Sequence, residues 1–164
     1  MTRQPSLALD DRPVDRKVVL SGLWVATMFI FAYVDIFGFW RADVIQGALD
    51  GAVPVVGFEI GQRFLALTTV YVLIPSLMVV ASLVLPARVN RVTQLVAAPL
   101  YLLSIVAAAV GETWLYFQIG SAAEVLLLGV VTWLAWSWPR VPASPARPAS
   151  PTSPASPASP ARTS

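Results

Sequence analysis

Five ionisable side chains stand out because each falls inside or beside a long apolar segment of the sequence. They are Asp35, Glu59, Arg63, Glu112 and Glu124. Carboxylates with different pKa values can perform acid–base chemistry, and a carboxylate facing a guanidinium can form a buried ion pair. The chain has no histidine and no cysteine, which excludes imidazole and thiolate as metal ligand, base or redox group. We therefore predict neither a metal site nor a cofactor, and no catalytic residue.

The composition describes the surroundings of these side chains. Of 164 residues, 57% are hydrophobic and only 12% are charged, and the mean hydropathy is +0.71. Soluble domains carry about 25% charged residues. A chain of this length cannot bury so much apolar surface in one core, so we expect it to lie in lipid.

Four apolar runs are long enough to cross a bilayer, which takes about 20 residues each. The expected spans are approximately residues 18–40, 62–85, 92–111 and 122–138. They are too continuously apolar for barrel strands, in which apolar and polar residues alternate. We therefore predict an all-α fold, a four-transmembrane-helix up-down-up-down bundle over residues 17–139. Residues 1–16 read as a flexible N-terminal segment, and the Pro/Ser/Ala-rich residues 140–164 as a disordered tail.

Local signals suggest where two of the helices begin. Pro86 ends the second apolar run, and Asn90 is a plausible N-cap for the third helix. The stretch "SAAE", Ser121 to Glu124, has the spacing of a capping box at the start of the fourth. In this interpretation Glu124 has a structural role, in which it complements the helix dipole.

Basic residues predict the orientation of the bundle. Nine of them fall on the side that holds both termini, and only Arg41 and Arg63 fall on the other. Because cytoplasmic loops carry the excess of Lys and Arg, we predict a multi-pass protein of the bacterial plasma membrane with both termini cytoplasmic. The basic residues follow this rule and form no patch, so we predict no binding of nucleic acid.

The five ionisable side chains fall near one level on the outer side. Asp35 lies seventeen residues after Val18, about 26 Å along a helix, near the outer edge of a hydrocarbon core about 30 Å thick. If the groups face inward, Arg63 would pair with Asp35 or Glu124, and Glu59 would join them if the loop over 41–61 caps the bundle. The alternative is that these groups, Glu112 above all, reach water at the interface.

Three short segments resemble a known family. The segments are "FAYVDIF", "ARVNR" and "YFQIGSAAEV". With them, residues 17 to 139 resemble an uncharacterised family of small bacterial four-helix integral membrane proteins. The layout is more loosely similar to DoxX-like membrane proteins, some of which are accessory partners of redox enzymes. The resemblance implies a fold and a location, and it supplies no catalytic residue.

Three functions remain open at this point. We favour a non-enzymatic integral membrane protein that binds a partner or lipid, because no catalytic motif is present. Its partners would be the lipid bilayer and a second membrane protein or another copy of itself. The alternative is a small protein that translocates a ligand or ion through the outer acidic cluster. The least favoured is an enzyme that uses interfacial carboxylates on a lipid or quinone.

Overall fold

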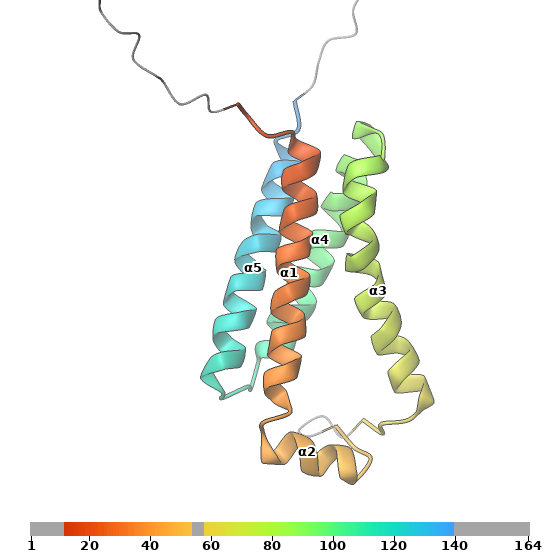
Figure 1. Cartoon of the computed structure of the whole chain (residues 1–164), viewed down its shortest axis with the longest axis vertical. Helices are drawn as coiled ribbons and strands as arrows, with labels where there is room; N and C mark the ends of the chain where they lie inside the picture. The colour runs from red at the N-terminus through yellow and green to blue at the C-terminus, as the bar shows by residue number, and fades with distance from the viewer. Residues whose placement is uncertain (1–11, 54–57, 140–164) are drawn as a thin grey trace, which may run out of the picture.

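The computed structural model describes residues 12–53 and 58–139, and this part of the chain is helical (Figure 1). Its helices are α1 (Arg16–Gly38), α2 (Ala42–Leu49), α3 (Gln62–Val84), α4 (Ala87–Ala109) and α5 (Leu115–Trp136). All except the short α2 are long and apolar enough to cross a membrane. The predicted all-α fold with four membrane-spanning helices is confirmed. The predicted disordered tail over 140–164 and most of the predicted flexible N-terminal segment lie outside the described residues.

The spanning helices alternate in direction. α1 and α4 run toward the end of the bundle that α2 crosses, and α3 and α5 run back (Figure 1). The start of α1 and the end of α5 therefore lie together at the opposite end. We call these the α2 end and the terminal end. The α2 end corresponds to the outer side of the sequence prediction.

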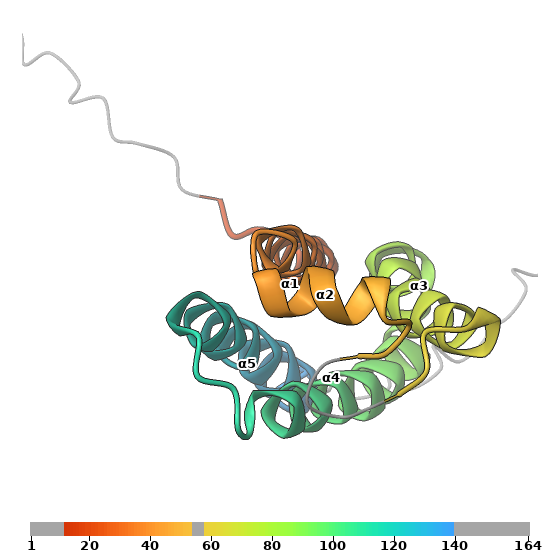
Figure 2. The same ribbon diagram turned by 90° about the horizontal axis from the view of Figure 1, so that it is seen from below.

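The bundle is tight at the terminal end and open at the α2 end. α1 packs against α3 and α5, and α5 packs against α4, whereas α3 and α4 touch each other little (Figure 2). The buried residues of α3 are Pro75, Met78 and Ser82, all in its terminal half. Between Gln62 and Ile74, no residue of α3 is buried. One half of α3 is thus fixed in the bundle, and the other diverges from it (Figure 1).

A buried hydrogen-bond network fixes the terminal half. The Trp24 indole N–H donates to Gln94 Oε1 at 2.7 Å. Gln94 Nε2 donates to Ser82 Oγ at 2.7 Å and to Asn90 Oδ1 at 3.0 Å, and Asn90 Nδ2 donates to the Ser82 carbonyl at 2.6 Å. All four side chains are fully buried. Because an unsatisfied polar group in lipid costs several kcal/mol, this network ties α1, α3 and α4 together.

Two predicted helix starts are wrong. The third helix begins at Ala87 rather than near residue 92, so Asn90 is no N-cap but a buried residue inside α4. The fourth begins at Leu115 rather than near residue 122, and its N-cap is Trp114. Ser121 and Glu124 therefore form no capping box, since both lie buried in the middle of α5. In each case polar residues that resemble a helix start are instead buried inside the helix by packing between helices.

Gly120 sets the contact between α1 and α5. It is buried, and a Cβ atom at this position would overlap Cγ2 of Val34. Small residues at such positions let two membrane helices approach closely. Gly129 follows nine residues later, on the opposite face of α5, and has open space where a Cβ would be.

We predict that Gly120→Ala destabilises the protein by about 1–3 kcal/mol, because a β-branched neighbour cannot move aside without strain. The matched control is Gly129→Ala in the same helix, which should be neutral or slightly stabilising. The measurement is the thermal unfolding midpoint of each variant in nanodiscs. Equal midpoints for the two variants would contradict the close contact.

Candidate intramembrane carboxylate site

Glu124 lies near the middle of its membrane-spanning helix. It follows Leu115 by nine residues, which places it about 14 Å from the α2 end of α5, in a hydrocarbon core about 30 Å thick. Its side chain is buried, with 4% of the residue exposed. The Oε1 atom is buried and has no hydrogen-bond partner among the described residues. The prediction that Glu124 stands at the outer edge is wrong, because α5 begins seven residues earlier than expected.

Asp35 lies close to Glu124, on α1. It follows Phe31 by four residues, and the ring of Phe31 lies 6.3 Å from that of Tyr71 in α3. Val34 is next to Gly120, so Asp35 is about one turn nearer the α2 end than Glu124. Asp35 is exposed. Because residues four apart lie on the same face of a helix, Asp35 lies, like Phe31, on the face of α1 that is turned toward α3.

Two tyrosines and a serine form a layer beside the carboxylates. Tyr101 donates a hydrogen bond to the Tyr71 carbonyl at 2.6 Å. The Tyr71 hydroxyl is 2.7 Å from Ser104 Oγ, and Ser104 donates in turn to the Tyr101 carbonyl at 2.8 Å. The two tyrosine rings lie 4.8 Å apart. This layer joins α3 to α4 where the bundle begins to open, and each spanning helix contributes at least one polar side chain to the site.

No basic side chain in the described parts of the chain pairs with Asp35 or Glu124. At the terminal end, Lys17 donates to the carbonyls of Leu83 and Leu85, and Arg91 donates to that of Ala135. Within the described ranges, no three Asp, Glu, His or Cys residues come together in a way that could hold a metal. The arrangement can therefore hold a proton or a cation that another molecule provides.

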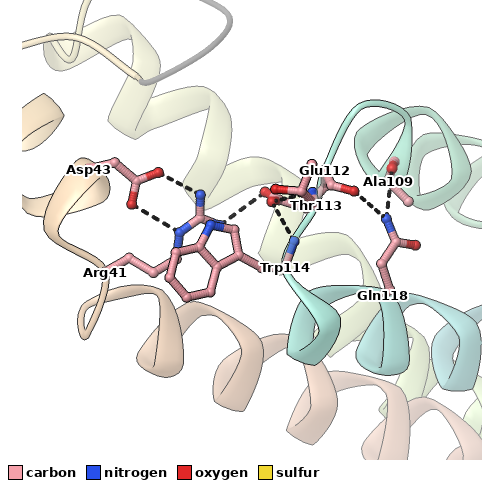
Figure 3. A network of polar contacts seen from close by, with 7 residues as sticks. All are labelled: Arg41, Asp43, Ala109, Glu112, Thr113, Trp114 and Gln118. Atoms are coloured by element: carbon pink, nitrogen blue, oxygen red, sulfur yellow. Dashed lines mark hydrogen bonds and ion pairs between the residues drawn. The ribbon is translucent and has the colours of Figure 1, made fainter.

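A second polar cluster lies at the α2 end (Figure 3). Arg41 donates to Asp43 at 3.1 and 2.6 Å and to Glu112 at 3.0 Å. Its guanidinium carbon lies 4.7 Å from the centre of the Trp114 ring. Glu112 also accepts from the backbone N–H groups of Thr113 and Trp114. We call Arg41, Asp43, Glu112 and Trp114 the Arg41 clamp. It joins the start of α2 to the loop between α4 and α5.

The five side chains singled out from the sequence do not form one cluster. Asp35 and Glu124 share the interior site, whereas Glu112 belongs to the Arg41 clamp. The predicted ion pair between Arg63 and Asp35 or Glu124 is not among the contacts of the described residues. Arg63 is exposed on the first turn of α3, the part of the helix that diverges from the bundle.

Glu59 also stays outside the interior site. It is exposed and forms an isolated backbone bridge with Ala52 in the connection between α2 and α3. The predicted cap over the bundle is provided in part by α2, which lies across the open end (Figure 2). Sequence reasoning missed the role of Arg41. A usable signal in the sequence was Gly111 directly before Glu112, because a glycine after an apolar run indicates a turn. In the structure Gly111 has a positive φ of 86° just after α4, and the turn presents Glu112 to Arg41.

Residues 10–143 match the model of a protein family of unknown function. The chain belongs to DUF6326. No curated protein and no solved structure matches it. The family match supports the expectation of an uncharacterised membrane-protein family. The bacterial origin and the looser likeness to DoxX-like proteins stay predictions.

In this DUF6326 chain the Arg41 clamp shifts the acid–base properties of its members. Burial acts to raise the pKa of Glu112, but the hydrogen bonds from Arg41, Trp114 and Thr113 outweigh it and hold the pKa below its ordinary 4.5. The Arg41 hydrogen bond lowers the pKa of Asp43 below 3.8. The pKa of Arg41 is raised, first by its hydrogen bond to Asp43. Carboxylates with lowered pKa values stabilise the folded state above their unfolded pKa, and this contribution disappears as the pH falls through the folded pKa.

We predict that Arg41→Gln lowers the unfolding midpoint by about 2–4 °C at neutral pH, equivalent to about 1 kcal/mol for a partly screened ion pair. The difference from the wild type should shrink as the pH falls below about 4, since the carboxylates become protonated. The measurement is thermal unfolding in nanodiscs across this pH range. Arg63→Gln is the matched control, because Arg63 is exposed and forms no ion pair in the described segments. A loss as large in the control would refute the clamp.

Proposed function

We propose that this protein is a non-enzymatic membrane protein that binds a lipid or another membrane-dissolved partner inside the α2-end half of its bundle. The observation that carries the proposal is the unpartnered, buried carboxylate of Glu124 at mid-depth. An ionisable side chain near the bilayer centre costs about 2.5–3.5 kcal/mol on insertion scales, and such residues mark functional sites. Packing alone gives no reason to keep this carboxylate without a partner.

The open side of the bundle supports this proposal. Since α3 has no buried residue before Pro75, a molecule in the bilayer can approach the Tyr71 layer between α3 and α4 without passing through the loops. A second surface also favours lipid. An apolar groove of about 350 Å³ runs between α1 and α5 and is lined by Phe29, Tyr33, Phe37, Tyr116 and Ile119 among others. Its volume lies within the range of about 300–1,000 Å³ of small-molecule sites.

The distribution of charge supports the predicted orientation. In the described residues, the terminal end carries Arg12, Arg16, Lys17, Arg88 and Arg91 with Asp15. The α2 end carries Arg41 and Arg63 with a larger number of carboxylates. The positive-inside rule then favours cytoplasmic termini, and we place the protein in the plasma membrane in this orientation. The binding site opens toward the outer half of the bilayer.

We predict that native mass spectrometry of the protein released from nanodiscs detects a stoichiometric added mass that Glu124→Gln removes or reduces. The substitution keeps the volume of the side chain and removes its charge. Glu59→Gln, an exposed carboxylate on the same side, is the matched control and should keep the added mass. A bare chain in the wild type, or an added mass that persists in Glu124→Gln, would contradict binding at this site.

The depth of Glu124 also favours a second candidate, translocation of a ligand or ion, because transporter sites lie near the bilayer midplane. In this case proteoliposomes should show a proton or cation flux down an imposed gradient. We predict that Glu124→Gln reduces the flux by at least tenfold, as expected when the one mid-depth charge of the described helices is removed. Asp35→Asn should reduce it less, since Asp35 lies nearer the end of the pathway. Absence of flux in the wild type under every gradient would exclude this candidate.

A further inference from the structure

We propose that Glu124 and Asp35, with the rings of Tyr71 and Phe31, form a binding site for a lipophilic organic cation. The inference rests on the proposed function in one respect, that the ligand occupies the interior of the bundle. It adds the chemical class of the ligand, which the family match does not provide. The argument uses charge, ligand geometry and access.

The charge of the site selects for a cation. Asp35 and Glu124 lie on the neighbouring helices α1 and α5, about one turn apart along the bundle, and none of the described Lys or Arg side chains pairs with them. Arg41 is not available as a basic partner for these carboxylates, because it pairs with Asp43 and Glu112. An anionic ligand such as a fatty acid or a phosphate would add a third negative charge in a medium of low dielectric constant, which strengthens the repulsion. A buried carboxylate is stabilised by a positive partner or becomes neutral by binding a proton.

The ligand set selects against a metal ion. Calcium takes six to eight oxygen ligands, and zinc takes four, mostly from cysteine and histidine. The site has two carboxylates, and within the described ranges no third acidic, histidine or cysteine residue joins them. Aromatic rings lie near these carboxylates: the Phe31 and Tyr71 rings lie 6.3 Å apart, and Tyr71 lies beside Tyr101. Carboxylates combined with aromatic faces are the chemistry that recognises organic cations.

The positions of the two carboxylates suggest a route into the site. Asp35 is exposed and one turn nearer the α2 end, whereas Glu124 is 4% exposed and deeper. A cation arriving through the open side would meet Asp35 first and Glu124 second. On the terminal side, the ring of Tyr101 packs edge-on against the buried Trp24.

Protons compete with the cation for the same groups. The titratable side chains that face the site are Asp35 from α1, Tyr71 from α3, Tyr101 from α4 and Glu124 itself from α5. Of these, the carboxylates exchange protons at the lowest pH. When the cation binds to a protonated Glu124, that carboxyl group must release its proton to the solvent. Binding should therefore weaken as the pH falls and should be accompanied by proton release.

The test is isothermal titration of tetraphenylphosphonium into the full chain in nanodiscs of zwitterionic lipid, in two buffers of different ionisation enthalpy. We expect saturable binding and a buffer-dependent heat that reports proton release. Glu124→Gln should weaken the affinity more than about tenfold, as expected for the loss of one partner of a desolvated charge pair. Asp35→Asn should weaken it several-fold, Glu124→Asp should retain part of the binding, and the exposed control Glu59→Gln should leave it unchanged.

The inference is overturned if the wild type shows no saturable binding, or if Glu124→Gln and Glu59→Gln bind equally well. If Glu124→Gln does not fold, the wild type still tests the site, because bound tetraphenylphosphonium should protect Glu124 from modification by a hydrophobic carbodiimide. Modification at an unchanged rate would then overturn it. If native mass spectrometry detects an added mass on the wild type that Glu124→Gln removes, but tetraphenylphosphonium does not bind, the cation class fails and the proposed function stands. If neither is seen, both fail.

Discussion

The lipid around this protein offers no partner to a polar group, and the position of each helix follows from how its polar side chains are satisfied. Gln94 is the centre of that arrangement. It accepts from Trp24 of α1 and donates to Ser82 of α3 and Asn90 of α4. Because all four side chains are fully buried, breaking any of these bonds leaves a buried donor or acceptor unpaired. The terminal half of the bundle is fixed for this reason.

The α2 end is held differently. There α3 and α4 diverge, and the Arg41 clamp connects the start of α2 to the loop between α4 and α5 without involving α3 (Figure 3). An ion pair near the interface tolerates water and small displacements, whereas the Gln94 network does not. The protein therefore has a rigid half and an open half, and Glu124 lies close to the boundary between them. A carboxylate that remained in the rigid half would have to be paired within the protein.

Much of the fold follows from the sequence, since composition and run length alone predict four spans, and the first two are placed within two residues of their observed ends. The starts of α4 and α5 could not be predicted, because Asn90 and Ser121 have the residue types of helix caps and their burial depends on neighbouring helices. The error at α5 moved Glu124 from mid-depth to the edge. The sequence analysis expected Arg63 to form the ion pair on the outer side, whereas Arg41 forms it. Which arginine is in reach of a carboxylate depends on the direction in which α3 leaves the α2 end, and residue types do not encode that direction. By contrast, Gln94, inside the third apolar run, was a readable sign of a polar contact between helices.

The carboxylates of the interior site are placed by a contact that carries no charge. Gly120 lets α5 approach Val34 of α1 closely, and this contact fixes the register that puts Glu124 one turn below Asp35. Neither carboxylate forms an ion pair within the described residues, so neither contributes to the stability of the scaffold through an ion pair. The residues that hold the helices, Gly120, Gln94 and Arg41, are separate from those that could recognise a ligand. Such a separation lets the ligand chemistry of the site differ between relatives while the bundle stays the same.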